Sequence, residues 1–203
     1  MSIAVLYEWV ADMRVGAKLK TEDALLRAAE SLLEAGGPEA VTTRAVCDAA
    51  KVGAPTLYHH YGDKNGLLDA LVAKGVKAFL KRKQAVADTA DARADLVAGW
   101  QDFIAFALER PQLFRLMVQR VGDNPQILDA ALERTDARLI RLAKEGRLTT
   151  DVPFARRSLL ALSNGVTALW TQGASKAQVE AVGLFLLDAT LCVLVSADDN
   201  QPP

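Results

Sequence analysis

The sequence has no long hydrophobic run and no recognisable export signal. Its longest apolar stretch, residues 181–196, is interrupted by Gly183 and Asp188 and is shorter than the ~20 residues that a membrane helix needs. Residues 1–10 lack the basic start of a signal peptide, and Glu8 is also unfavourable for one. We therefore expect a cytoplasmic protein that has no membrane partner.

Cysteine and histidine, which supply most metal sites and many catalytic sites, are scarce. Cys47 and Cys192 lie far apart and match no metal or redox spacing, so we expect reduced, buried structural residues. His59 and His60 are neighbours, and neighbours on a helix point about 100° apart, which disfavours chelation of one ion. No phosphate-binding glycine loop is present, and no serine has a histidine near it in sequence. These absences predict no metal, no cofactor and no enzymatic activity.

Aromatic residues are also few, at 6% of the chain, whereas alanine and leucine are abundant. This composition favours helix over sheet. Apolar residues recur at helical spacing, and turn residues separate the segments. The pattern predicts an all-α protein of about nine helices, at residues 21–36, 42–50, 53–62, 63–83, 91–109, 111–120, 124–145, 153–173 and 176–197.

The two ends of the chain give weaker signals. Residues 1–20 are expected to form a leader with a short amphipathic helix, in which Ile3, Leu6 and Trp9 share a face. Whether Arg14, Lys18 and Lys20 form a basic arm that reaches DNA is left open by the sequence. Residues 198–203 are expected to form a disordered tail.

Charge is distributed unevenly along the chain. Residues 40–83 contain eight Lys or Arg against three Asp or Glu, whereas residues 84–203 contain twelve against fifteen. A basic segment on an otherwise acidic protein is typical of local contact with phosphates. The same segment holds three short helices with tight connections, which describes a helix-turn-helix unit.

Residues 41–68 read VTTRAVCDAAKVGAPTLYHHYGDKNGLL, and this stretch resembles the signature of TetR-family repressors. The resemblance is most specific over residues 55–61 and at Lys64, Leu67 and Leu68. It implies an N-terminal DNA-binding domain that binds double-stranded operator DNA, followed by a domain for dimerisation and ligand binding. The corresponding boundaries are residues 1–20 for the leader, 21–66 for the helix-turn-helix domain, 67–197 for the second domain and 198–203 for the tail.

The resemblance also assigns a set of DNA contacts. The third helix would lie in the major groove, where Tyr58 and His59 reach bases or phosphates. Leu57 and Tyr61 would face inward. The full set of expected DNA-binding residues is Thr43, Arg44, Ala54, Pro55, Thr56, Tyr58, His59, His60 and Lys64.

Two positions depart from the family pattern in the turn between the second and third helices. Lys51 stands where glycine is usual, and a left-handed backbone costs a non-glycine residue ~1 kcal/mol. Gly53 stands where a serine cap is usual, which is a milder change. Both affect the expected pose of the third helix rather than the assignment of the motif.

The second domain is expected to dimerise and to bind a small molecule. A dimer is needed to span two half-sites of a palindrome, and helices 153–173 and 176–197 are apolar enough to form its interface, where Gly165 and Gly183 would permit close backbone approach. The apolar residues expected at this interface are Leu159, Leu160, Leu162, Val166, Leu169, Val182, Phe185, Leu186, Ala189 and Val193. Asn164 and Thr167 would be costly to bury without a polar partner, which favours a mostly hydrophobic ligand with a few polar contacts. The expected ligand-binding residues are Trp100, Phe103, Ile104, Ala107, Leu113, Phe114, Met117, Leu128, Leu132, Asn164, Thr167 and Trp170.

An alternative stays open at this point. The same first 70 residues are compatible with a DNA-binding protein that has no small-molecule ligand and acts in nucleoid structure or protein interaction. Such a protein would have a filled core in its second domain. Repression and activation are also not distinguished by the sequence.

Overall fold

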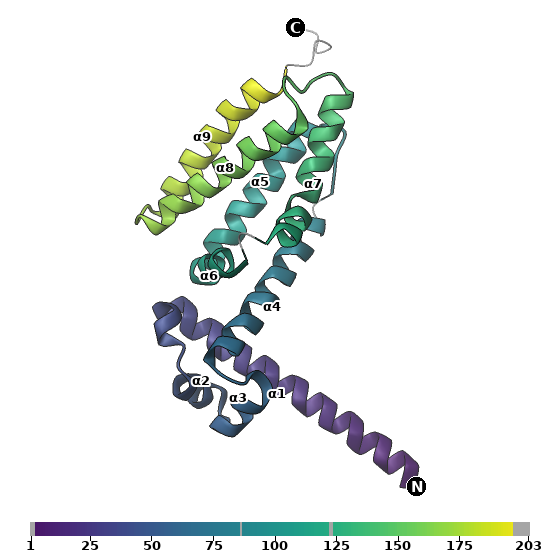
Figure 1. The fold of residues 1–203 in the computed structure, drawn as a ribbon, viewed down its shortest axis with the longest axis vertical. Coiled ribbons are helices and arrows are strands. Elements are labelled where there is room, and N and C mark those ends of the chain that lie inside the picture. The colour runs from purple at the N-terminus through teal and green to yellow at the C-terminus, as the bar shows by residue number, and fades with distance from the viewer. Residues whose placement is uncertain (1–2, 86, 122–123, 197–203) are drawn as a thin grey trace. The chain divides into compact units, whose positions relative to one another are not determined.

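A computed structural model describes the backbone of residues 3–85, 87–121 and 124–196, and the side chains from Lys20 onward except those of residues 86, 121–123, 125, 171 and 197–203. Within these residues the chain forms nine α-helices and no strand, which confirms the all-α prediction (Figure 1). The helices are α1 (Ile3–Ala40), α2 (Thr43–Ala50), α3 (Ala54–Tyr61), α4 (Lys64–Ala85), α5 (Ala92–Glu109), α6 (Pro111–Val121), α7 (Pro125–Lys144), α8 (Val152–Thr171) and α9 (Lys176–Leu194).

The first helix starts earlier than the sequence pattern indicates. The prediction of a separate leader over residues 1–20 and of a start at Thr21 is wrong for the backbone, because α1 is helical from Ile3. Extending an existing helix avoids the cost of nucleating a second one, and residues 14–21 hold no proline. The break predicted at Gly36 and Gly37 is confirmed, with φ of 70° at Gly37. The side chains proposed for an amphipathic face and a basic arm before Lys20 lie outside the described residues, as does the tail.

The first compact unit comprises the residues up to Lys77 together with residues 111–120. Its core is a set of fully or nearly buried aliphatic side chains from α1 to α4: Leu25, Ala29, Leu33, Val41, Val46, Leu57, Leu67, Leu68, Leu71 and Val72. The predicted inward face of the fourth helix, from Leu67 to Val72, is therefore confirmed.

Helix α6 belongs to this first unit, although the sequence placed it in the second domain. The carboxylate of Glu34 in α1 accepts hydrogen bonds from the backbone N–H groups of Gln112 (3.2 Å) and Leu113 (2.8 Å). It thereby satisfies donors that the first turn of a helix leaves free. Gly75 of α4 has no side chain, and a Cβ there would meet the side chains of Met117 and Leu113. These contacts explain why the boundary between the units falls after Lys77 and not at the predicted residue 66.

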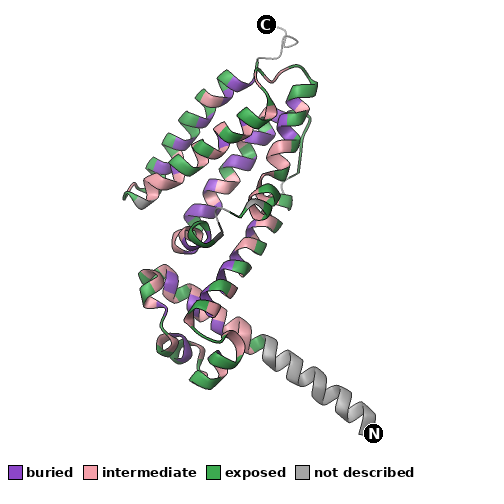
Figure 2. Cartoon of the chain, in the orientation of Figure 1, coloured by how far each residue is buried: buried purple, intermediate pink, exposed green. Residues whose placement is uncertain are grey.

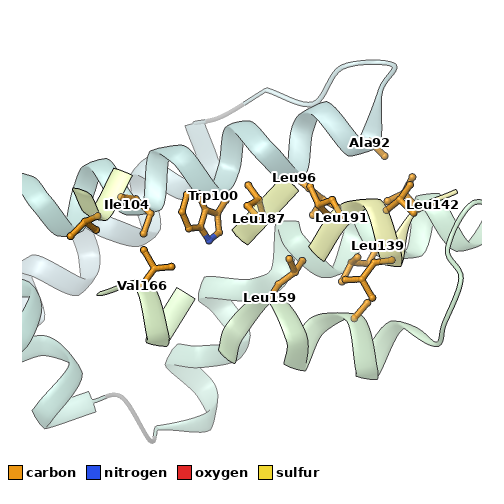
Figure 3. Close-up of a cluster of buried hydrophobic side chains, with 14 of the residues drawn as sticks. Ala92, Leu96, Trp100, Ile104, Leu139, Leu142, Leu159, Val166, Leu187 and Leu191 are labelled. Carbon is orange, nitrogen blue, oxygen red and sulfur yellow. The ribbon is translucent and has the colours of Figure 1, made fainter. Parts of the chain in front are cut away.

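The second compact unit comprises residues 78–110 and the residues after 120. Its core is built from stripes with a spacing of about four residues, the period that keeps side chains on one face of a helix (Figure 3). Helix α5 contributes Ala92, Leu96, Trp100, Ile104 and Leu108, α7 contributes Leu139 and Leu142, α8 contributes Ala155, Leu159 and Val166, and α9 contributes Val179, Leu187, Leu191 and Leu194.

Gly183 of α9 serves this internal core. A Cβ at this position would collide with the indole of Trp100 and meet Val166 at 3.0 Å. The sequence-based interpretation that Gly183 allows close approach of a second subunit is therefore replaced by a contact inside the chain. Cys47 is buried as expected, whereas Cys192 is exposed, contrary to the expectation of a buried residue.

Candidate DNA-binding interface

The turn between α2 and α3 sets the pose of α3. Thr42 caps α2, since its hydroxyl oxygen accepts a hydrogen bond from the N–H of Ala45 at 3.1 Å. Helix α2 ends at Lys51, whose backbone is left-handed with φ of 57° and ψ of 43°. Lys51 therefore adopts the left-handed conformation that glycine usually supplies at this position, and the turn is not closed in a different way. The N–H of Val52 then donates to the carbonyl of Cys47 at 3.0 Å and closes the turn.

Helix α3 begins without a side-chain cap. Gly53 is extended, with φ of −79° and ψ of 152°. No described side chain accepts a hydrogen bond from the free backbone N–H groups in the first turn of α3. Pro55 lies in the first turn, where its missing N–H is not needed. The helix ends at Gly62, with φ of 77°, and Asp63 then accepts a hydrogen bond from the N–H of Gly66 at 2.8 Å at the start of α4. Both ends of α3 are therefore fixed by short, directed connections.

The inner face of α3 packs against α1. Leu57 is fully buried, and the hydroxyl of Tyr61 donates to the carbonyl oxygen of Glu22 at 3.2 Å. Burial raises the pKa of Tyr61, and the carboxylates of Glu22 and Asp23 raise it further. The inward orientation predicted for Leu57 and Tyr61 agrees with these contacts.

His60 also belongs to this inner face and not to the outer one. Its side chain is only 6% exposed, and its Nδ1 lies 3.1 Å from the Glu22 carboxylate. The family resemblance implies a phosphate contact for His60, whereas its side chain lies against α1. A step of one residue turns a helix by about 100°, and here that step takes the second imidazole into the packing with α1.

The outer face of α3 carries the remaining predicted residues of this helix. Ala54, Pro55 and His59 are exposed, and the Tyr58 side chain is 51% exposed. Their spacing of i, i+1, i+4 and i+5 places them on one face, and α3 is largely exposed along it (Figure 2). Thr56 is half-buried beside them. The helix therefore presents a phenol and an imidazole on a surface formed otherwise by small residues.

Positive charges flank this face on the neighbouring helices of the first unit. The Arg44 side chain is 93% exposed, and its only described ion pair is a distant one with Asp48 at 3.9 Å. Thr43 is the first residue of α2 and Lys64 the first residue of α4, and both are half-buried. A helix start adds backbone N–H groups to the positive charge of Lys64.

Two residues of this region were missed as functional candidates. Lys51 is exposed in the turn that precedes α3, so it adds a cation beside the outer face. Glu22 orients α3 through both His60 and Tyr61. The basic character of Lys51 was visible in the sequence, whereas 38 or 39 residues separate Glu22 from its partners, and no local pattern indicates that pairing.

The predicted ligand-binding residues divide between the two units. Leu113 and Met117 are buried in the first unit next to Gly75, and Phe114 lies on the same helix. The other nine lie in the second unit, where Trp100, Ile104 and Ala107 are buried, Phe103, Leu128, Leu132, Thr167 and Trp170 are half-buried, and Asn164 is exposed.

The reasoning that Asn164 and Thr167 need a buried polar partner does not hold. Asn164 is exposed, and the hydroxyl of Thr167 donates to the backbone carbonyl of Ser163 at 2.9 Å. Trp100 is the clearer case of a buried polar group that needs a partner, because its Nε1 is buried and has no hydrogen-bond partner within the described part of the chain.

The residues predicted for the dimer interface also separate into two groups. Leu159 and Val166 are buried in the chain's own core. In contrast, α9 exposes a run of large apolar side chains, of which Phe185 and Val193 are each 73% exposed and Val182 is 40% exposed. Helix α9 is also long and apolar enough to cross a membrane by length and composition, but its opposite face packs into the core through Val179, Leu187 and Leu191.

Two comparisons with known proteins agree on one family. Residues 25–71 match the family described as bacterial regulatory proteins, tetR family. The tetracycline repressor protein class C of Escherichia coli is 31% identical over 170 residues, which cover 82% of this chain and 72% of that protein. The chain belongs to the TetR family.

Solved structures share the fold of this TetR-family chain. SmeT, the repressor of the Stenotrophomonas maltophilia multidrug efflux pump SmeDEF, aligns with a TM-score of 0.68 and 22% identity over 91% of this chain and 96% of SmeT. The regulator FadR from Bacillus subtilis, solved in complex with stearoyl-CoA, aligns with a TM-score of 0.68 and 17% identity over 83% of this chain and 97% of FadR. The family and these neighbours are transcriptional regulators and not enzymes.

Proposed function

We propose that this protein is a cytoplasmic transcriptional repressor that binds a palindromic operator as a homodimer and is released from it by a small, mostly hydrophobic molecule. The observation that carries the proposal is the outer face of α3, where Tyr58 and His59 are exposed while Leu57 and His60 hold the helix against its own unit. A rigidly held helix with polar groups directed outward is what insertion into a major groove requires.

The proposed DNA contacts follow from exposure and chemistry. Tyr58 and His59 on α3 reach base edges or phosphates, with Ala54 and Pro55 allowing the backbone to approach. Arg44 and Lys64 contribute charge from either side, and Thr43 and Thr56 contribute hydroxyl groups. His60 is no longer part of the set. Lys51 joins it because of its exposed position in the turn.

The proposed homodimer uses the exposed face of α9 together with α8. Large exposed apolar groups on one helix, including Phe185 and Val193, are unfavourable in water and typical of a protein interface. Gly165 on α8 supports the same arrangement, because a Cβ there would meet no atom of the described residues within 4 Å. A two-fold dimer through these helices would present two copies of α3 to two half-sites.

The proposed effector site lies within the second unit. It includes Phe103, Leu128, Leu132 and Trp170, which are half-buried, together with Trp100, whose indole N–H is a buried donor with no partner among the described residues. A ligand changes operator affinity only if it binds the two states of the dimer with different affinities. The residues of α6 are left out of this set because they pack within the first unit.

Selection of genomic DNA fragments on the purified protein tests DNA recognition and gives the operator. Tyr58→Phe and Lys64→Ala should each weaken operator binding by ~1–3 kcal/mol, the range for single specific contacts or charged hydrogen bonds. Lys64→Ala should also reduce the slope of log affinity against log salt by about one. Lys144→Ala, an exposed charge on α7, is the matched control and should leave affinity unchanged.

Two results would count against this proposal. Recovery of fragments with no shared sequence would indicate general nucleoid binding. Unchanged operator affinity in both Tyr58→Phe and Lys64→Ala would remove the outer face of α3 from the interface.

A further inference from the structure

Two cations converge on Gly99 inside the second unit. The ammonium group of Lys83, near the end of α4, donates to the carbonyl oxygen of Gly99 at 3.3 Å. The guanidinium of Arg138 on α7 lies over the same residue, since a Cβ built at Gly99 would collide with its Nη1. Gly99 is therefore the point on α5 that lets two basic side chains from different helices approach each other.

Lys83 has an unusually apolar environment for a charged group. Its Nζ lies 5.8 Å from the centre of the Phe79 ring and 5.7 Å from that of Phe103. Burial lowers its pKa to about 8; the negative charge of Asp102 opposes this shift, and the positive charge of Arg138 adds to it. Within the described residues, no carboxylate lies within 4 Å of this ammonium group.

Arg138 is the most deeply buried cation of the cluster. Its side chain is 4% exposed, and its Nε donates to the Asp88 carboxylate at 2.9 Å. Its Nη2 is buried and has no hydrogen-bond partner among the described residues. A buried donor of this kind costs free energy until an acceptor satisfies it.

The charges around Gly99 do not balance. Arg82 pairs with Asp102 and Glu109, while Asp88 pairs with both Arg134 and Arg138. With Lys83 included, four cations face three carboxylates. One positive charge is therefore in excess among these described groups. Asp88 and Glu109 are partly exposed, whereas Arg138 is buried and Lys83 half-buried, and an unpaired charge is unfavourable where solvent is excluded.

We propose that Lys83 and Arg138 form a binding site for the carboxylate of an acidic small molecule. One excess positive charge matches one carboxylate, which would accept hydrogen bonds from the Lys83 ammonium and the free Nη2 of Arg138. Phe103, already in the proposed effector set, borders Lys83 and connects the site to the apolar part of the second unit. This inference rests on the proposed function, and it narrows the effector from a hydrophobic compound to a hydrophobic carboxylic acid.

The experiment uses the full-length protein and paired probes. The probes are straight-chain carboxylates of six to twelve carbons and phenylalkanoates, each measured against its own primary amide, which has the same shape and no charge. Thermal unfolding and calorimetric titration are recorded for the wild type, Lys83→Met, Arg138→Lys and the control Lys81→Met, an exposed lysine on the same helix as Lys83. Arg138→Lys keeps the positive charge but removes the guanidinium N–H donors. It therefore tests the anion site if Lys83→Met does not fold.

We expect acids to bind the wild type and the Lys81→Met control more tightly than their amides. Lys83→Met and Arg138→Lys should lose about tenfold or more in acid affinity, the effect of one charge-assisted hydrogen bond, with amide affinity little changed. Without any ligand, Lys83→Met should melt at a higher temperature than the wild type, because an unpaired buried charge is removed. Equal binding of acids and amides to the wild type would overturn the proposal, as would full acid preference in the variants.

Release of an operator fragment, measured with the same compounds, separates this inference from the proposed function. If acids bind through Lys83 and the fragment stays bound, the anion site stands and the effector role fails. If only uncharged compounds release the fragment, the regulator stands and the anion site is overturned.

Discussion

The two units of this chain differ in where their polar and apolar side chains lie. In the first unit, two buried or half-buried polar contacts hold helices together, Glu22 with His60 and Glu34 with the start of α6, and the outward face of α3 is polar or small. In the second unit, α9 exposes Phe185 and Val193 to solvent, while cations such as Arg138 are buried. Among the described residues, the second unit exposes more large apolar side chains than the first, and a partner would cover them.

The comparison indicates where binding energy is available. A polar outer face costs nothing in water and can exchange water for DNA phosphates and base edges. Exposed apolar groups and buried excess charge are both unfavourable in the isolated chain, so a second subunit or an anion that covers them stabilises the protein. In the proposed function, DNA recognition by the first unit therefore uses groups that are well solvated without DNA, and binding by the second unit uses groups that are unfavourably placed without a partner.

The largest expected effect is on the apolar face of α9. Phe185→Glu places a carboxylate in the proposed dimer interface, where it should weaken association by about 3 kcal/mol or more, roughly a hundredfold. Operator binding should fall with it, because one half-site contact cannot replace two. Sedimentation and operator titration measure both, and Ile140→Glu, an exposed apolar position on α7 of the same unit, is the control. A dimeric Phe185→Glu protein would move the interface away from α9.

The adjacent histidines of α3 test whether the inner and outer faces of this helix have different roles. His60→Ala removes a buried ring and its contact with Glu22, so it should lower the free energy of unfolding by ~1–3 kcal/mol. His59→Ala removes an exposed ring and should leave unfolding nearly unchanged while it weakens operator binding. Denaturant titration and operator titration of the pair measure the two effects. The reverse pattern would show that α3 is rotated relative to the face described.

The charge excess of the second unit predicts a pH dependence of stability. The folded-state pKa of Lys83 is about 8, below its ordinary value of 10.5, so from pH 8 to 10.5 the unfolded chain binds more protons at this site than the folded chain. Stability from this group therefore rises with pH through that window and is lowest below pH 8, where both states are charged. Asp102 and Arg138 are the other charged groups that act on Lys83.

Comparison of the wild type with Lys83→Met isolates this effect from other alkaline titrations. Between pH 7 and pH 10, the melting temperature of the wild type should rise by about 3 °C relative to that of the variant. This shift corresponds to roughly 1 kcal/mol for a chain of this size. A difference that stays constant with pH would mean that Lys83 titrates normally and is well solvated.

The smallest expected effect is in the turn before α3. Lys51→Gly removes the Cβ that a left-handed backbone disfavours, and this gain is partly offset by the greater freedom of glycine in the unfolded chain. We expect unfolding to become harder by about 0.5 kcal/mol, measured by denaturant titration. A clear loss of stability would indicate that the lysine side chain stabilises this turn.

Much of the fold was predictable because it depends on local patterns. Leu67 and Leu71 are one helical turn apart and are both buried, Gly36 and Gly37 interrupt α1, and Lys51 has the left-handed conformation that its position implied. The predicted end residues of α5 and α6 differ from the observed ones by a single position. In each case neighbouring residues carry the information, through periodicity, capping or backbone conformation.

The errors share a different origin. The family resemblance implies a DNA contact for His60, and helical spacing indicates a ligand contact for Leu113 and Met117, but neither shows what lies opposite a residue. Glu22 lies opposite the first, and Gly75 makes room for the other two. Gly183 was read as a point of contact between subunits, and the indole of Trp100 occupies that space instead.

The sequence by itself determined the helices, their order and the helix-turn-helix motif, since these follow from interactions over a few residues. The tertiary structure decided which side of α3 is free, which unit holds α6 and where Lys83 and Arg138 meet. Those outcomes depend on pairs such as Glu34 with Leu113 and Gly99 with Arg138, which are 79 and 39 residues apart. Contacts at such separations form only when helices pack, and their partners are chosen by shape and charge across that packing, which no local pattern encodes.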